Sequence, residues 1–128
     1  IVTNGYFVLG MPGETSKSIQ DSYKFATSLP LDEIGLQLAV PYPGTQLEKM
    51  SRVYGWLKVD ARSLIAEDGA GGVVFIETPS MSASLLVEER KNFFKRFYLN
   101  RIFRNPLRYL MRVLKKPSMV IRFIFGER

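Results

Sequence analysis

The order of apolar and polar residues predicts a strand followed by a helix at the start of the chain. Tyr6–Leu9 is a short, unbroken apolar run that stops at a Pro-Gly turn, as in a strand covered on both faces. Ser16–Leu29 then carries apolar residues at helical spacing. Thr15 or Ser16 can cap the start of this helix, and Pro30 closes its end.

The same order repeats once. Ile34–Val40 is a second strand of buried character, and the turn Pro41–Thr45 ends it. Gln46–Tyr54 then forms a short helix that stops at Gly55. Strands joined through a helix in this way lie parallel, which predicts the α/β class. Both Pro-Gly turns follow the carboxyl ends of their strands, the edge at which ligands bind in parallel α/β folds.

The pattern weakens beyond this unit and then becomes helical. Most of Trp56–Ser80 is predicted to be loop, with Val73–Ile76 as a short strand or an extended segment. Ser82–Leu99 gathers aromatic residues on one side of a predicted helix. A further helix is predicted to start at Asn105-Pro106, on the strength of an aliphatic stripe that comprises Leu107, Leu110, Met111 and Leu114.

Charge divides the chain at about Pro79. Through Ser80 there are six Lys/Arg and nine Asp/Glu, a net charge of −3. From Met81 on there are twelve Lys/Arg and three Asp/Glu, a net charge of +9, so that the whole chain carries +6. We therefore predict two parts, residues 1–80 and a basic, aromatic helical extension over residues 81–128. With 46% hydrophobic residues among 128, and no apolar run near the roughly 20 residues that span a bilayer, we expect a folded cytoplasmic protein.

The residues that are missing exclude several chemistries. The chain has no Cys, which excludes disulfides, thiolate catalysis, Cys-ligated zinc and an iron–sulfur cluster held by this chain alone. It has no His either, which excludes a Ser-His-Asp triad and the commonest metal sites. We predict no catalytic residue and no metal ligand, so any demanding chemistry needs a cofactor or residues outside this chain.

Two turn motifs carry the most information. Gly5 through Thr15 reads GYFVLGMPGET, in which Gly10 and Gly13 allow positive φ or a close approach of a ligand. Taken alone, this motif favours a plain strand-to-helix turn. The second strand, however, ends in PYPGT, from Pro41 to Thr45, so that two successive strands end in Pro-Gly turns at one edge.

Together with the later helix, these motifs resemble a known domain. A Trp-bearing loop and the helix ERKNFFKRFYL, with Arg96-Phe97-Tyr98, follow the two turns. This succession resembles the C-terminal half of the radical S-adenosylmethionine (SAM) domain, in the class with a cobalamin-binding domain upstream. The resemblance spans nearly the whole chain and is strongest over Gly5–Gly44. GxPGET alone recurs in several branches of the superfamily, whereas its combination with PYPGT is more specific.

The resemblance implies a fold and a chemistry. Radical SAM enzymes use a partial (β/α), TIM-like barrel, in which three cysteines hold a [4Fe-4S] cluster that cleaves SAM to a 5′-deoxyadenosyl radical. Because this chain has no Cys, it is expected to be a C-terminal fragment, inactive alone, with the N-terminal part of the same enzyme as its partner. The cluster, and cobalamin where it is used, would be bound outside this chain. The substrate would be a small molecule that these residues do not identify.

Cofactor-binding residues are also implied for the first motif. The resemblance places Val8 against the adenine of SAM, with Gly10 as the motif glycine and Glu14 as its closing acidic residue. This sequence has one residue, Pro12, more than the shorter form of the motif. Alternatively, Val8 is ordinary core and Glu14 is a charge that interacts with the dipole of the following helix.

For the second motif, the resemblance implies that Val40 and Pro41 lie beside the adenine and offer backbone contacts. Tyr42 would reach toward the substrate side. The alternative for Val40 is again ordinary barrel core.

The basic extension has three interpretations. Its cations can form a solvated or domain-packing surface, which is the first expectation for the stripe between Leu107 and Leu114. They can instead contact an anionic membrane at its inner face, which gives an alternative function: a small α/β binding module docked on that membrane. Nucleic acid is the least favoured partner, since the sequence shows no known nucleic-acid-binding motif.

Overall fold

The computed structural model describes residues 1–59, 73–107 and 111. These form, in order, β1 (Asn4–Leu9), α1 (Ser16–Ser28), β2 (Glu33–Leu38), α2 (Gln46–Val53) and α3 (Ala83–Arg104). The order of strands and helices predicted from the sequence is confirmed. The last helix extends five residues beyond its predicted end at Leu99, to Arg104.

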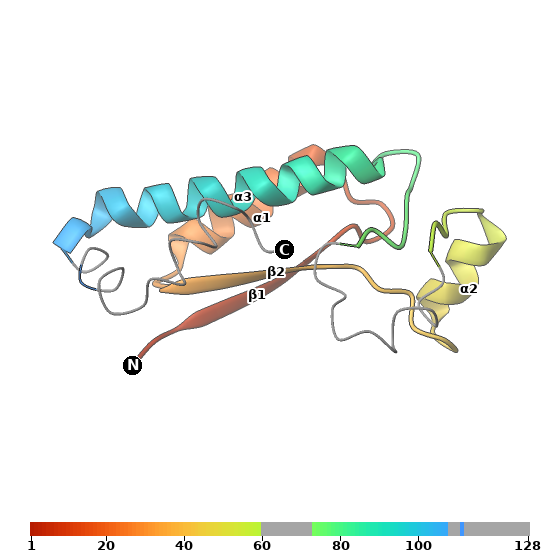
Figure 1. Cartoon of the computed structure of the whole chain (residues 1–128), viewed down its shortest axis with the longest axis horizontal. Coiled ribbons are helices and arrows are strands. Elements are labelled where there is room, and N and C mark those ends of the chain that lie inside the picture. Colours follow the sequence, from red (N-terminus) through yellow and green to blue (C-terminus); the bar gives the residue numbers. More distant parts are fainter. Residues whose placement is uncertain (60–72, 108–110, 112–128) are drawn as a thin grey trace.

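The two strands pair in parallel, as predicted. Tyr6 lies opposite Gly35 and Val8 opposite Gln37 in the register. α1 connects the strands, and α1 and α3 lie side by side on one face of the sheet (Figure 1). The described chain is therefore α/β. It shows two strands of a sheet and no closed barrel.

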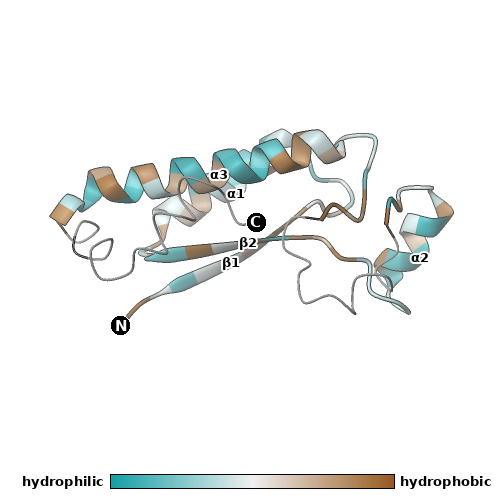
Figure 2. Cartoon of the chain, viewed as in Figure 1, coloured by the Kyte–Doolittle hydropathy of each residue, from teal (hydrophilic) through white to brown (hydrophobic). Residues whose placement is uncertain are grey.

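The main core lies between the sheet and these two helices. Apolar residues alternate with polar ones along the length of α3, and some of them face the sheet (Figure 2). The ring of Phe93 lies 5.7 Å from that of Phe7 and meets Tyr23 edge-on at 5.6 Å. Such pairs add to the stabilisation that comes from burial alone. The buried members of this core are Leu9, Ile19, Ala26, Ile34, Leu36, Leu38, Met81, Leu86, Phe93 and Phe97.

Two arginines of α3 cap the carboxyl end of α1. Arg101 is buried and donates to the carbonyl oxygens of Ala26 (3.3 Å) and Leu29. Arg104 donates to the carbonyl oxygen of Thr27 at 3.1 Å. The last turn of α1 has no basic residue of its own, so α3 supplies the positive charge that this end of the helix dipole favours.

A smaller apolar cluster lies beyond the carboxyl ends of the strands, next to α2 (Figure 1). Phe75 and Ile76 are buried there and pack against Trp56. Ile76 forms an antiparallel bridge with Leu57. Of the segment 73–76, predicted as a short strand or an extended stretch, only Ile76 forms a bridge, and the segment does not extend the parallel sheet.

The predicted helix after Asn105 lies mostly outside the described residues. Pro106, Leu107 and Met111 are helical, whereas Leu110, Leu114, Arg108 and Arg112 are not among the residues described. The division into residues 1–80 and 81–128 stays a prediction.

Candidate functional site

Both Pro-Gly turns leave the sheet at the same edge. The strands are still paired where they end, because the amide of Ala39 donates to the carbonyl oxygen of Leu9 at 2.8 Å. All six residues that the resemblance singles out lie on the last residues of the strands or in the turns that follow. Figure 1 shows this edge of the sheet facing α2.

The two glycines of the first turn share a backbone conformation and differ in their surroundings. Gly10 has a φ of 88° and Gly13 a φ of 87°, so the positive φ expected of both is confirmed. Gly10 is buried, and a Cβ built on it would lie 2.8 Å from Cδ2 of Leu86. A Cβ on Gly13 would meet nothing within 4 Å. Gly10 therefore lets α3 approach the end of β1, and Gly13 serves the turn alone.

Glu14 folds back onto the same turn. Its carboxylate accepts a hydrogen bond from the amide of Gly10, and its carbonyl oxygen accepts one from Oγ of Ser80 at 2.9 Å. Partial burial raises the pKa of the Glu14 carboxyl, and hydrogen bonds from the backbone of Gly10 and Met11 oppose that rise. In this structure Glu14 therefore holds the turn that follows β1.

The second turn uses the same device. The amide of Gly44 donates to Oε2 of Glu48 at 2.7 Å, and Oε1 of Glu48 accepts from Nε of Arg52 at 3.0 Å. Thr45 caps α2 through the amide of Glu48. In both turns a glutamate four residues after a glycine accepts that glycine's N–H. Sequence reasoning missed Glu48, although the spacing of Gly44 and Glu48 repeats that of the first turn and could have indicated it.

The end of β2 is mostly closed. Val40 is half-buried against the smaller cluster, and its carbonyl oxygen accepts from the amide of Tyr42 at 3.0 Å. Pro41 is buried, whereas the side chain of Tyr42 is exposed. Of the six implied residues, Val8 and Tyr42 thus offer open side chains.

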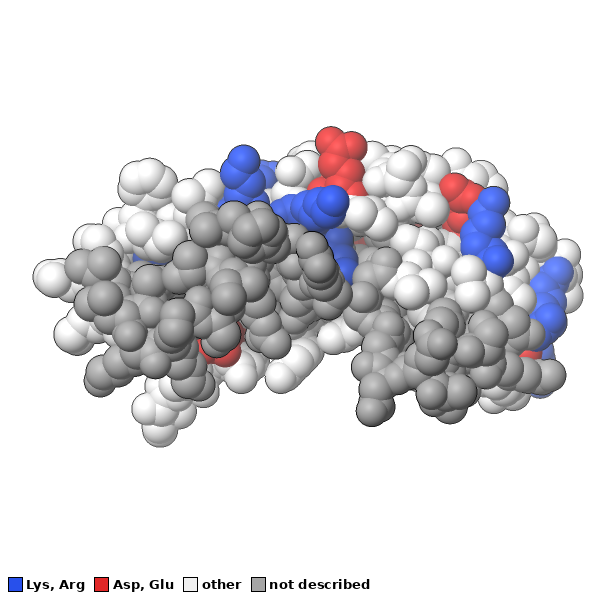
Figure 3. Space-filling model, viewed as in Figure 1, with Lys and Arg blue, Asp and Glu red and all other residues white. Residues whose placement is uncertain are grey.

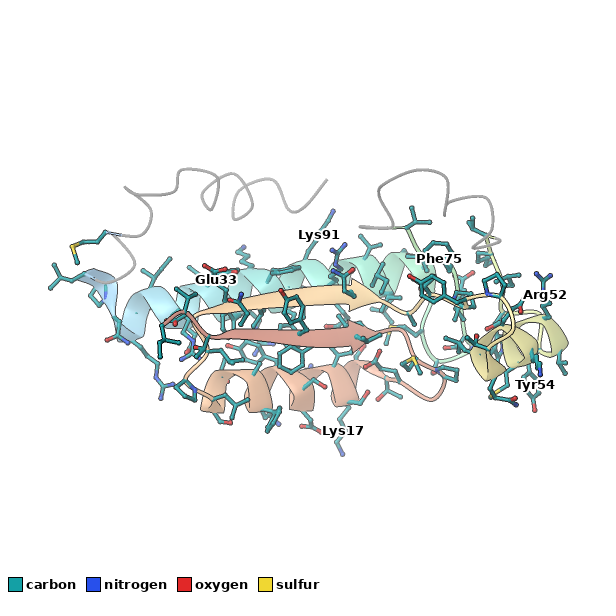
Figure 4. All side chains as sticks on the ribbon, turned by 90° about the horizontal axis from the view of Figure 1, so that it is seen from below. Lys17, Glu33, Arg52, Tyr54, Phe75 and Lys91 are labelled. Atoms are coloured by element: carbon teal, nitrogen blue, oxygen red, sulfur yellow. The ribbon has the colours of Figure 1, made fainter. Side chains whose placement is uncertain are left out.

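No described residue packs over the face of the sheet opposite the helices. Figure 4 looks onto this face, with the helices behind the strands. Val8 is 54% exposed here, and Tyr6 and Gln37 are exposed beside it. The Tyr6 ring lies across Gly35, since a Cβ built there would come within 2.7 Å of the ring. The prediction that the first strand is covered on both faces is wrong for the described chain, because α1 and α3 both pack on the same side.

The two outer edges of the sheet differ. Along β2, the amides of Glu33 and Ala39 donate to the β1 side. Backbone groups alternate in direction along a strand, and Leu36 is three residues from each of these two. The N–H and C=O of Leu36 therefore point to the outer edge of β2. There its carbonyl oxygen accepts from Nε of the buried Arg90 at 3.0 Å. Within the described residues no strand pairs with the outer edge of β1.

The described residues contain neither a cluster of metal-binding side chains nor a helix that could span a membrane. Residues 1–59, 73–107 and 111 hold no group of three or more acidic side chains placed to bind a metal ion. Within the same ranges, no helix has both the length and the apolar character needed to cross a bilayer.

Comparison with known proteins gives one partial match. The chain is 42% identical over 43 residues to an uncharacterized methyltransferase of Pyrococcus horikoshii. The match covers 34% of this chain and 9% of that protein, so the chain corresponds to a small part of its relative. No family model and no solved structure matches the chain.

Proposed function

We propose that this chain is the C-terminal part of a radical SAM enzyme and that its open sheet face and carboxyl edge contact SAM. Three observations support this: the paired motifs GYFVLGMPGET and PYPGT, the partial identity to a methyltransferase, and the uncovered face of a parallel sheet. Parallel sheets are almost always covered on both faces. The open face, on which the large apolar side chains of Tyr6 and Val8 are exposed, therefore indicates that a ligand or further protein belongs there.

The exposure of the Val8 side chain is the observation that carries the proposal. A branched apolar side chain at the carboxyl end of a parallel strand is 54% exposed, and it lies on the face away from the helices. Covering its exposed part stabilises a complex by about 1 kcal/mol. In our proposal Val8 packs on the adenine ring, and Tyr42, also exposed, lies toward the substrate.

The other implied residues shape this site. Gly10 brings α3 close to the end of β1, and the carboxylates of Glu14 and Glu48 hold the two turns by accepting glycine amides. Val40 and Pro41 form the wall between the sheet and the smaller cluster, since Val40 packs into that cluster and Pro41 is buried. These residues position the cofactor.

The chemistry itself would come from outside the chain. A [4Fe-4S] cluster with SAM supplies the 5′-deoxyadenosyl radical, and it requires thiolate ligands that this chain, which has no Cys, does not contain. The residues present fit SAM contact and do not fit the cluster. The difference between the two sheet edges supports the same proposal. At the outer edge of β2, Arg90 donates to the carbonyl oxygen of Leu36, whereas no described strand pairs with the outer edge of β1. Further strands of a barrel would therefore pair with β1.

The direct test is a titration of the isotope-labelled chain with SAM, followed by NMR. We expect shift changes at Val8 and Tyr42 and none along the exposed side of α1. The matched variants are Val8→Asp and Phe25→Asp, because Phe25 is 59% exposed but lies on α1, behind the sheet. Val8→Asp should weaken binding at least about fivefold, while Phe25→Asp should leave it unchanged.

Two results would contradict the proposal. One is equal weakening by both variants, or shifts confined to the helices. The other is genomic: a natural start codon immediately before Ile1, with no Cys-x3-Cys-x2-Cys motif in the same operon. We expect this motif to lie upstream in the same reading frame.

A further inference from the structure

We propose that the carboxyl end of α3 and the residues that follow it bind an anionic lipid surface. This proposal does not depend on the proposed function, since it concerns the basic extension and not the sheet.

The first observation is a set of apolar side chains exposed to solvent. Phe103 is 83% exposed and Leu107 is 76% exposed, and Met111 is exposed four residues further on. Earlier in α3, which also contains Phe103, the side chains of Phe93 and Phe97 are buried in the core. The expectation that the stripe beginning at Leu107 packs on the α/β unit is therefore wrong for Leu107 and Met111, the two members that the structure describes.

The second observation is the charge of this region. Residues 90–126 contain eleven Lys/Arg and no Asp or Glu. Arg90, Arg101 and Arg104 hydrogen bond to main-chain carbonyls of the α/β unit. Four further cations follow within residues 105–116, namely Arg108, Arg112, Lys115 and Lys116. Exposed apolar side chains in a segment whose sequence has an unbroken excess of cations have the composition that binds anionic bilayers.

A bilayer fits these side chains better than a nucleic acid does. Among the exposed apolar side chains of this surface, Leu107 and Met111 are aliphatic and only Phe103 has an aromatic face on which a base could stack, whereas the acyl boundary of a membrane takes up all three. On the visible face of the described residues, Lys and Arg are separated by uncharged and acidic residues (Figure 3).

The test is co-sedimentation of the chain with vesicles. One set is made of phosphatidylcholine alone, and in the other part of it is replaced by phosphatidylglycerol. We expect binding to the anionic vesicles that weakens as salt is raised, because cations near an anionic surface are screened within a Debye length. Charge reversal at Arg108 and Arg112 should weaken binding at least about twentyfold, since each lost cation is worth about fivefold.

Matched variants separate this surface from other exposed apolar residues. Leu107→Ser should weaken vesicle binding about tenfold. Val53→Ser is its control, because Val53 is 79% exposed on α2, at the far end of the molecule from the end of α3 (Figure 1). Val8→Ser controls for adsorption through the open sheet face. Neither control should change the affinity.

Three outcomes would overturn the proposal. They are equal binding to both kinds of vesicle, loss of binding in Val8→Ser or Val53→Ser but not in Leu107→Ser, and tighter binding to a single-stranded oligonucleotide than to the anionic vesicles. Because the readout is lipid binding, a negative SAM titration would leave this test unaffected.

Discussion

Gly10 and Gly13 allow the contribution of one long-range contact to be measured against a local control. Both have φ near +87°, so alanine at either position is forced into the left-handed region at a cost of about 1–2 kcal/mol. The smaller conformational entropy of the unfolded alanine chain offsets about 0.4–1 kcal/mol of that. Gly13→Ala, whose Cβ meets nothing within 4 Å, should therefore lose about 1 kcal/mol of unfolding free energy.

Gly10→Ala adds a steric cost. Its Cβ would lie 2.8 Å from Cδ2 of the buried Leu86, and overpacking of this kind costs about 1–3 kcal/mol. We therefore expect Gly10→Ala to lose about 2–4 kcal/mol, clearly more than Gly13→Ala. The difference belongs to the contact between the first turn and α3.

Pulse proteolysis in urea measures these losses, because it works on dilute protein and needs no reversible melt at high concentration. Leu86→Ala provides the internal check: it removes the clashing methyl group, so Gly10→Ala should cost about 1–3 kcal/mol less in that background. Equal destabilisation by Gly10→Ala and Gly13→Ala, or no coupling with Leu86→Ala, would refute the packing of α3 on this turn.

Three further outcomes are expected. Arg101→Met should lower the unfolding free energy by about 2–4 kcal/mol, because the carbonyls of Ala26 and of the C-cap residue Leu29 lose a buried donor. Arg101→Lys should recover only part of this loss, and pulse proteolysis measures both variants. Burial raises the pKa of the Glu14 carboxyl in the folded chain. The stability that protonation of this carboxyl adds to the fold is therefore fully present below the unfolded pKa of 4.5 and is lost as pH rises through the folded pKa. Glu14→Gln should therefore be at least as stable as wild type near neutral pH and lose that advantage in acid, unlike Glu14→Ala, which should be destabilised throughout. The chain alone should self-associate or bind a hydrophobic dye through its open sheet face, on which Tyr6 and Val8 are exposed. The double variant Tyr6→Ser, Val8→Ser should reduce both effects. A cooperative melt of a monomer that binds no dye would instead show a self-sufficient domain.

The sequence by itself determined the local features of this protein. Pro-Gly turns, apolar runs and a helical stripe predict β1, α1, β2 and α2 in order, because each of these signals acts over a few residues. The parallel pairing also follows, since a helix between two strands returns the chain in the same direction. The motifs at the two turns lie at one edge of the sheet, as their positions after the two strands predict.

Only the tertiary structure decided how these residues are used. A glycine at position 10 leaves room for the side chain of Leu86 as well as allowing the positive φ. The carbonyl oxygen of Glu14 accepts a hydrogen bond from Ser80. Both contacts join residues more than sixty positions apart in the sequence. The packing of both helices on one face leaves Val8 exposed, and the end of α3 leaves Leu107 exposed. Periodicity shows which residues share a face, but the partner of that face comes from distant parts of the chain or from another molecule.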